Sequence, residues 1–232
     1  MALPCTRALI VGAGAGISAA VARALRAAGV EVAVAARNTA KLAPLARAHG
    51  LQAFEVDAAS AASVAALFAA VGERLGEPEF VLYNAGARLR GSLLDLDPDA
   101  VEAALAVNAL GGFHVAQQAA RRMLPKGQGA IFFTGATASL KGYAHSAAFA
   151  MGKFALRALA QSAARELGPQ GIHVAHFVID GGVRSAARPA PADRPDGLLD
   201  PDAIAQSYLA VLAQPRSAWS FEVDLRPWVE SF

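Results

Sequence analysis

The sequence predicts an α/β fold, a doubly wound parallel sheet covered by helices on both faces. Short apolar runs rich in β-branched residues alternate along the chain with Ala-rich segments of helical periodicity. The first run passes straight into a turn that holds Gly12, Gly14 and Gly16, and a helical segment follows at once. Strand, glycine turn, helix and strand make a βαβ unit, which places its two strands parallel in one sheet.

The same unit repeats through the chain and defines the elements that we expect. The predicted strands are 7–11, 30–35, 51–56, 79–83, 130–133, 172–178 and a last sheet strand at 221–225. The predicted helices run from the glycine turn to residue 28 and over 39–48, 60–75, 98–123 and 147–167. Such strict alternation is typical of a three-layer αβα fold of Rossmann type. A chain of 232 residues fits one such unit, so we expect a single domain over residues 1–232.

Composition argues against membrane and disulfide-rich classes. Hydrophobic residues make up 55% of the chain, yet no apolar run reaches the ~18–20 residues that span a bilayer. The first apolar stretch is broken by Arg7 and runs into glycines, which favours a buried strand over a secretory signal. The one cysteine, Cys5, allows no internal disulfide, so a reducing cytoplasm is the expected location.

The charge pattern gives no reason to expect a nucleic-acid partner. The formal net charge is +2, and the sequence has no block of Lys and Arg. Arg121, Arg122 and Lys126 lie close together, but basic residues at the end of a helix complement its dipole. The histidines do not form a metal-spaced set with acidic neighbours, so no metal site is expected.

The glycines of the first turn predict a nucleotide site. Glycine lets backbone N–H groups approach a pyrophosphate, and the N-terminus of the following helix favours its negative charge. Gly12 and Gly16 fit this requirement, while Ile17 and Ser18 stand where the usual fingerprints place a third glycine. A small serine fits where helix meets strand, so we expect binding to be retained, with Ile17 at the site. The alternative is a plain glycine-rich turn.

The end of the second predicted strand favours NADP(H) over NAD(H). An acidic residue at this point would bind the ribose hydroxyls of NAD and repel a 2′-phosphate. Here Ala36 is followed by Arg37, whose guanidinium suits bidentate contact with that phosphate. The alternative for Arg37 is a solvated surface arginine.

Further motifs resemble the short-chain dehydrogenase/reductase family over nearly the whole chain. Asn84-Ala85-Gly86 ends the fourth predicted strand, Asn108 lies in an Asn-Ala-Leu-Gly sequence, and Lys153 follows an aromatic residue by four positions. In that family the first motif steadies the sheet beside the cofactor, and the Asn and Lys belong to the catalytic tetrad. An ordinary turn and a packed helix asparagine are the alternatives.

The resemblance also implies where other cofactor contacts lie. Asp57, after the third strand, corresponds to the residue that contacts the adenine, unless it only caps the next helix. Gly181 corresponds to the glycine of the family's Pro-Gly motif, and Ser185 to the hydroxyl near the nicotinamide amide. Lys153 would bind the ribose hydroxyls, and Asn108 would hold a water relay.

Two chemical groups of the family are missing. Phe149 stands at the position of the catalytic tyrosine, and Ala136, thirteen residues earlier, at that of the serine. General acid–base help is worth about 10²–10⁴ in rate, so its loss weakens carbonyl reduction, whereas positioning of the reactants remains. Tyr143 and His145 precede the helix and are candidate substitute proton donors. The alternative is that Tyr143 packs in the loop and His145 faces water.

Two functions remain open at this point. The first is an NADP(H)-dependent short-chain oxidoreductase that acts on a small, fairly apolar carbonyl or alcohol, with water or a loop residue as the proton source. The second is a non-catalytic NADP(H)-binding regulatory or scaffold protein.

Residues 185–201 correspond to the family's substrate lid. The shortness of this segment predicts an open or partner-completed pocket lined by Ala and Leu, with few polar anchors.

The long predicted helices also indicate self-association. Segments 98–123 and 147–167 carry small and apolar residues on more than one face, and helices of that kind are normally buried. In the family these helices build a dimer or tetramer interface, so we expect a homodimer or homotetramer.

Overall fold

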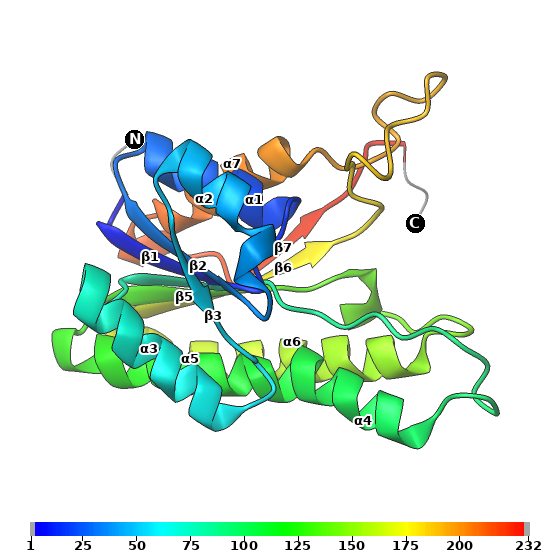
Figure 1. Ribbon diagram of the computed structural model, residues 1–232, viewed down its shortest axis with the longest axis horizontal. Helices are drawn as coiled ribbons and strands as arrows, with labels where there is room; N and C mark the ends of the chain where they lie inside the picture. The colour runs from blue at the N-terminus through cyan, green and yellow to red at the C-terminus, as the bar shows by residue number, and fades with distance from the viewer. Residues whose placement is uncertain (1–2, 230–232) are drawn as a thin grey trace.

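The computed structural model describes residues 3–229, and its seven strands form one parallel sheet (Figure 1). The strands are β1 (Arg7–Val11), β2 (Glu31–Ala36), β3 (Gln52–Glu55), β4 (Phe80–Tyr83), β5 (Gly129–Thr134), β6 (Ile172–Ile179) and β7 (Glu222–Leu225). Their order across the sheet is β3-β2-β1-β4-β5-β6-β7. The chain moves outward from β1 to β3 and then crosses back to β4, so the order reverses between β1 and β4. In doubly wound folds ligands bind at this point, outside the carboxyl ends of the strands.

Helices cover both faces of the sheet, as predicted (Figure 1). One layer holds α1 (Ile17–Ala27), α2 (Ala43–His49) and α7 (Pro201–Leu212); the other holds α3 (Ala61–Leu75), α4 (Pro98–Leu105), α5 (Gly111–Met123) and α6 (Ala147–Leu167). Short 3₁₀ turns lie at Thr39–Lys41, Leu124–Lys126, Thr137–Ser139, Gly168–Gln170 and Arg216–Ala218. The α/β doubly wound fold predicted from the sequence is therefore confirmed.

The core is divided by the sheet into two apolar layers. Side chains of successive strand residues point to opposite faces, so Ile10 packs in the layer of α1 and α7, whereas Leu9 and Val11 pack in that of α3, α5 and α6. All residues of β4 and β6 are buried, as expected for central parallel strands covered on both faces. This explains why the strands appear in the sequence as continuous apolar runs.

The segment predicted as one helix over 98–123 is interrupted by a π-helical turn. Residues Ala106–Leu110 form that turn between α4 and α5, and the N–H of Gly111 bonds back to the carbonyl of Ala106. The hydroxyl of Tyr83, at the end of β4, donates to the carbonyl of Val107. A π turn is often found at functional sites, and this one carries Asn108.

Helix α7 (Pro201–Leu212) is not among the helices predicted from the sequence. Helix α7 begins with signals that were present in the sequence: Asp200 accepts a hydrogen bond from the N–H of Asp202, and Pro201 occupies the first helical position. Residues Ile204, Ala205 and Tyr208 bury the apolar face of α7 against the sheet.

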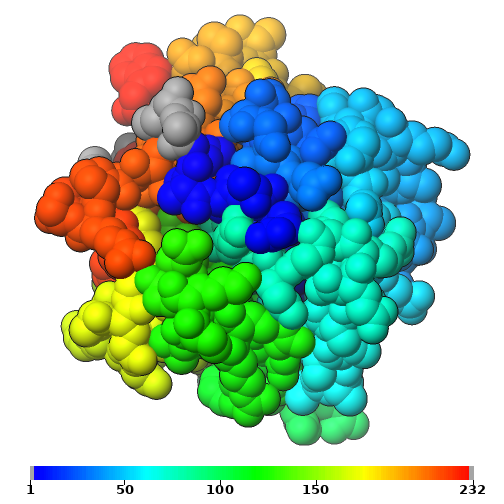
Figure 2. Space-filling model, turned by 90° about the vertical axis from the view of Figure 1, so that its left-hand side faces the viewer, coloured from blue at the N-terminus to red at the C-terminus, as the bar shows by residue number. Residues whose placement is uncertain are grey.

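The two ends of the sheet differ in character. Figure 2 shows the end where the strands begin, with the N-terminal residues in blue near its centre. At the opposite end, where the strands finish, the segment between β6 and α7 protrudes as a long loop (Figure 1). The parallel pairing of Val183 with Leu199 and an Arg184–Asp200 ion pair of 2.7 Å close the base of that loop. The candidate site lies at this end.

Candidate functional site

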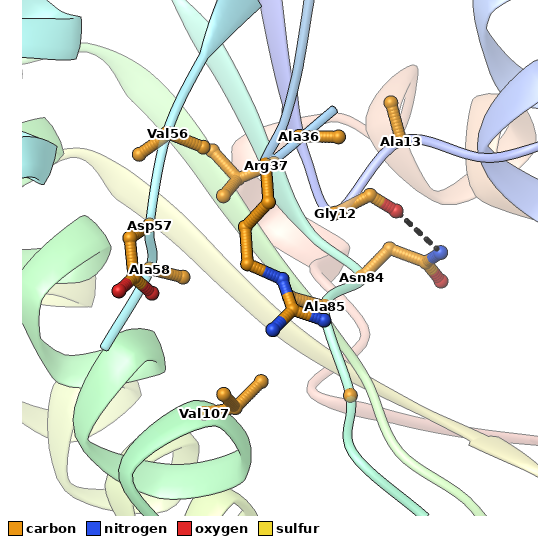
Figure 3. Close-up of a pocket in the computed structure, with 12 residues that line it drawn as sticks. Gly12, Ala13, Ala36, Arg37, Val56, Asp57, Ala58, Asn84, Ala85 and Val107 are labelled. Atoms are coloured by element: carbon orange, nitrogen blue, oxygen red, sulfur yellow. Dashed lines mark hydrogen bonds between the residues drawn. The ribbon is translucent and has the colours of Figure 1, made fainter. Parts of the chain in front are cut away.

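A first cavity lies at the carboxyl ends of β1 to β4, and we name it the Arg37 cavity (Figure 3). It brings together six of the predicted cofactor residues from four segments of the chain. Its lining consists of Val11, Gly12, Ala13, Ala36, Arg37, Val56, Asp57, Ala58, Asn84, Ala85, Gly86 and Val107.

The floor of the Arg37 cavity depends on a close approach between the first and fourth βα connections. Gly12 has φ +85°, and a Cβ atom built on it would lie 2.2 Å from the backbone nitrogen of Ala85. Ser18 donates to the carbonyl of Gly12 at 3.1 Å and accepts from the amide of Asn84 at 2.8 Å. Only glycine fits at position 12, and the buried Ser18 fastens the turn to β4.

The start of α1 suits a phosphate group. The N-cap residue Gly16 provides no side-chain hydrogen bond, so the first N–H groups of the helix have no capping partner there. A Cβ on Gly14 or Gly16 would meet no atom within 4 Å, so the space beside this turn is open. Uncapped N–H groups and the positive end of an 11-residue helix fit the pyrophosphate of a dinucleotide.

Arg37 and Asp57 enter the cavity from neighbouring strands. Figure 3 shows the guanidinium of Arg37 reaching across the cavity, with the carboxylate of Asp57 on the far side. The cap of α3 is Ser60, whose hydroxyl accepts from the N–H of Ser63. Asp57 accepts from the N–H of Ala59 at 3.0 Å instead, so it does not serve as the helix cap that the sequence left open.

A second cavity, which we name the Lys153 cleft, continues beyond Asn84 and Gly86. Its lining consists of Ile17, Asn84, Gly86, Arg88, Thr134, Gly135, Ala136, Phe149, Lys153, Ile179, Gly181, Gly182, Val183 and Arg188. Because Asn84 and Gly86 line both cavities, the two adjoin there, and together we call them the path along the ends of the strands. The predicted residues Ile17, Lys153 and Gly181 are thus brought to the same path.

Lys153 is a buried cation at the base of the cleft. Its side chain rises from α6, is 4% exposed, and donates to the backbone carbonyl of Thr134 at 2.8 Å. Burial, assisted by the positive charge of Arg88, lowers the pKa of Lys153 from 10.5 to about 8. A lysine with this pKa is mostly protonated at neutral pH and can give up its proton at slightly higher pH.

Phe149 and Ala136 form an apolar wall next to Lys153. The ring centroid of Phe149 lies 5.8 Å from Nζ of Lys153 and 5.1 Å from the guanidinium carbon of Arg88. Both cations are within reach of the negative face of the ring. Neither Ala136 nor Phe149 carries a hydroxyl, so the wall nearest the amine offers no proton donor.

Asn108 lies behind the cleft and does not line it. Its amide accepts from the N–H of Ala87 at 3.0 Å and donates to the carbonyl of Ala87 at 2.7 Å, which fixes the chain after β4. A Cβ on Gly152 would lie 2.5 Å from Cβ of Asn108, so α6 packs closely against the π turn. In this structure Asn108 uses its amide to hold the loop.

An outer cavity with a volume of about 350 Å³ extends the cleft toward solvent. Its lining consists of Arg88, Arg90, Ala136, Thr137, Ala138, Tyr143, Ala144, Ser146, Phe149, Ile179, Gly181, Gly182 and Arg188. Tyr143 is therefore beside the site, with its ring 5.7 Å from Nζ of Lys141. The expectation of few polar anchors is wrong, because three arginines line this cavity. The sequence signal was the pair Arg88 and Arg90 directly after Asn84-Ala85-Gly86.

Two predicted cofactor residues line none of these three cavities. Gly16 lies at the start of α1, outside their lining residues. The hydroxyl of Ser185 accepts from the N–H of Arg188 and lies in a separate hollow near Arg184 and Asp202. His145, the other candidate proton donor, has φ +61° and is likewise absent from the lining of the outer cavity.

Two kinds of feature are missing from the part of the chain that the structure describes. No three His, Cys, Asp or Glu side chains among residues 3–229 are grouped so that they could hold a metal ion. Over the same residues, no helix is both long enough and apolar enough to cross a bilayer.

The sheet order, the glycine turn and the buried lysine define a protein of the dinucleotide-binding α/β class. Residues 6–191 match the family model described as short chain dehydrogenase. The chain therefore belongs to the short-chain dehydrogenase family and is an oxidoreductase by type.

Relatives cover nearly the whole chain. An uncharacterized oxidoreductase of Staphylococcus aureus (strain N315) is 26% identical over 226 residues, which are 95% of this chain and 96% of the relative. The crystal structure of a short-chain dehydrogenase from Rhodopseudomonas palustris is 38% identical, with a TM-score of 0.82, and covers 97% of this chain and 100% of that one. An alcohol dehydrogenase from Thermococcus sibiricus, complexed with 5-hydroxy-NADP, is 26% identical with a TM-score of 0.84, covering 97% and 98% of the two chains.

The buried amine of Lys153 predicts a specific pH dependence of stability. Between about pH 8 and 10.5 the unfolded chain keeps a proton on this lysine that the folded protein has released, so the free energy of unfolding rises with pH. We expect Lys153→Met to lose this rise, which amounts to about 3 kcal/mol. Urea unfolding across this range, with the exposed Lys126→Met as control, measures the difference. If the free energy of unfolding changed with pH in the same way for Lys153→Met and wild type, the lowered pKa of Lys153 would be contradicted.

Proposed function

We propose that this protein is an NADP(H)-dependent oxidoreductase that interconverts a small carbonyl compound and its alcohol. The observation that carries the proposal is that the Arg37 cavity and the Lys153 cleft adjoin at Asn84 and Gly86. A dinucleotide laid along this path would place its adenosine half near Arg37 and Asp57 and its nicotinamide half in the Lys153 cleft. Relatives crystallised with 5-hydroxy-NADP and with NADP support the choice of nucleotide.

The residues of the path have distinct proposed roles. Gly12, Gly16 and Ile17 would receive the pyrophosphate at the N-terminus of α1. Arg37 would bind the 2′-phosphate, while Asp57, Asn84, Ala85 and Gly86 would line the adenosine side. Lys153 would bind the ribose hydroxyls, Gly181 would border the nicotinamide, and Ser185 would reach it if the loop that carries it moves inward. The proposed role of Asn108 is to hold the backbone at Ala87.

The proton supply is the unusual part of the proposed reaction. When bound, NADP(H) provides or accepts the hydride at nicotinamide C4, and carbonyl reduction also consumes one proton. Ala136 and Phe149 stand where the family's catalytic serine and tyrosine are expected, and neither can donate. The proton would come from water or from Tyr143, a loop phenol that lines the outer cavity.

A second function is favoured by the same two side chains. If Ala136 and Phe149 remove the proton chemistry altogether, the protein would bind NADP(H) without turnover and would act as a regulatory or scaffold protein. Every group proposed to hold the nucleotide remains present in that case. Binding and turnover therefore have to be measured separately.

Nucleotide binding is the first test. We expect wild type to bind NADPH at least about tenfold more tightly than NADH, since a charge-assisted pair with the 2′-phosphate is worth about 1.5–3 kcal/mol. Arg37→Gln should remove most of this preference and leave NADH affinity nearly unchanged. Nicotinamide fluorescence titration measures both affinities. Arg47→Gln on α2 is the control variant, because it also removes one exposed arginine. Equal affinity of wild type for the two nucleotides would reject the preference.

Turnover is the second test, and it separates the two functions. The double variant Ala136→Ser/Phe149→Tyr should oxidise NADPH with small aldehydes and ketones about 10²–10⁴-fold faster than wild type. Adding Lys153→Met to the double variant should remove the gain. A measurable wild-type rate that falls in Tyr143→Phe supports the enzyme with a loop donor. A double variant that turns over beside an inactive wild type supports the non-catalytic function.

We also propose that the protein is a homodimer or homotetramer. Leu110, Phe113, Met151 and Phe154 are large apolar residues that are between 43% and 54% exposed, and we name them the α5–α6 apolar face. Helices α5 and α6 lie side by side, because a Cβ on Gly112 would be 2.4 Å from the side chain of Leu156. Burial of these side chains against a second copy would remove the exposed face from water.

The oligomer is testable by light scattering at micromolar concentration. Wild type should have a mass that is a multiple of the 23.8 kDa chain. Phe113→Asp/Phe154→Asp should dissociate it, because two carboxylates would be buried without partners. Leu94→Asp, which changes a leucine that is 92% exposed outside this face, should not. A monomeric wild type would rule out the proposed assembly.

A further inference from the structure

The outer cavity contains an excess of positive charge that the proposed hydride transfer does not explain. Arg88 and Arg90 come from the segment after β4, and Arg188 comes from the loop between β6 and α7. Together with Lys153, they give the cleft and the outer cavity four basic side chains. No described Asp or Glu lines either space. The whole chain is nearly neutral, with 21 Lys and Arg against 19 Asp and Glu, so this local excess is a property of the site.

Two of the guanidinium groups contact neighbouring parts of the site. Arg88 lies over the ring of Phe149, at 5.1 Å from the centroid. Arg188 lies against Gly182, where a Cβ atom would be 2.6 Å from the guanidinium carbon. A side chain at position 182 would push Arg188 away, so the glycine lets this arginine approach the backbone closely. Both contacts lie beside the space that the cleft and the outer cavity share, because Arg88 and Arg188 line both.

The three arginines differ from others in the same region because they lack an acidic partner. Arg184 pairs with Asp200 at 2.7 Å, and Arg226 pairs with Asp180 at 3.0 Å and Asp224 at 2.8 Å. Within residues 3–229, no carboxylate forms an ion pair with Arg88, Arg90 or Arg188. Unneutralised guanidinium groups that line a cavity attract anions and bind planar oxyanions in bidentate fashion.

We infer that the substrate of this site carries an oxyanion, a carboxylate or a phosphate group, in addition to its carbonyl or alcohol carbon. Resting on the proposed oxidoreductase function, the inference adds the substrate class. The reacting carbon would lie against the apolar wall of Ala136 and Phe149 near Lys153, and the oxyanion would bind to Arg90 and Arg188 farther out. The sequence led us to expect a fairly apolar substrate. Under this inference, only the end of the substrate that reacts is apolar.

The phosphates of the nucleotide do not account for Arg90. This residue lines the outer cavity but neither the Lys153 cleft nor the Arg37 cavity, along which the nucleotide is proposed to lie. Arg88 and Arg188 line both the cleft and the outer cavity, so they border both proposed ligands. Arg90 is therefore the residue whose substitution separates substrate binding from nucleotide binding.

Calorimetric titration of the NADP⁺-saturated protein with two matched ligand pairs tests the inference. One pair is 4-oxopentanoate and its methyl ester; the other is dihydroxyacetone phosphate and dihydroxyacetone. The charged member of at least one pair should bind about tenfold or more tightly than its neutral partner, and added NaCl should weaken only the charged member. The pair with the larger difference identifies the oxyanion as carboxylate or phosphate.

Equal affinities within both pairs, or no binding by either charged member, would overturn the inference. The titrations are repeated without nucleotide, so that each proposal is judged by its own result. If the protein does not bind NADP⁺, the result counts against the oxidoreductase proposal. If the charged ligands bind no more tightly than their neutral partners, both with and without NADP⁺, the result counts against the oxyanion site.

Matched arginine variants locate the binding site. Arg90→Gln and Arg188→Gln should each weaken the charged ligand about tenfold and leave its neutral partner unchanged, and Arg90→Gln should keep the affinity for NADP⁺. Arg165→Gln is the control, because it removes the same charge roughly 24 Å along α6 from Phe149. An unchanged affinity of Arg90→Gln and Arg188→Gln for both charged ligands would place any anion binding elsewhere and overturn the assignment.

Discussion

The close approach of Gly12 to Ala85 is the constraint on which the candidate site depends. A side chain at position 12 would overlap the backbone of Ala85, so the ends of β1 and β4 could not come together. Ser18 and Asn84 then fasten the two connections through their hydrogen bonds with each other and of Ser18 with the Gly12 carbonyl. The order of the strands reverses between β1 and β4, and the Arg37 cavity lies at this point.

The second half of the site depends on the packing of α6 against the π turn. Gly152 lets the helix approach Asn108, and Asn108 binds both backbone groups of Ala87. This arrangement orients the segment from which Arg88 and Arg90 extend. From the next position of α6, Lys153 reaches the carbonyl of Thr134 at the end of β5. One helix thus positions the buried amine, the Phe149 wall and, through Asn108, the loop that supplies two arginines.

The candidate site combines two adjoining cavities at the strand ends with an apolar wall beside a buried amine. Burial lowers the pKa of Lys153, while Phe149 and Ala136 add only apolar surface beside it. An apolar wall of this kind would contact the carbon skeleton of a substrate and exclude water, but it has no group that can transfer a proton. The proposed selection by charge at the arginines of the outer cavity would serve an enzyme that positions its substrate and a regulatory protein that senses a metabolite equally well. Binding chemistry is therefore the property that the proposed functions share.

The sequence by itself determined the layers of the fold and most of the nucleotide path. Apolar runs, helical periodicity and the glycine turn depend on neighbours in the chain, so they specified the strands, the long helices and Gly12, Arg37 and Asn84 as candidates. The tertiary structure decided which side chains share a cavity. Arg90 and Arg188 lie about a hundred positions apart yet line one cavity, and Asn108, in a π turn, binds Ala87 from 21 positions away. Contacts of this kind form only when the chain folds over the sheet, so they cannot be predicted from the local periodicity of the sequence.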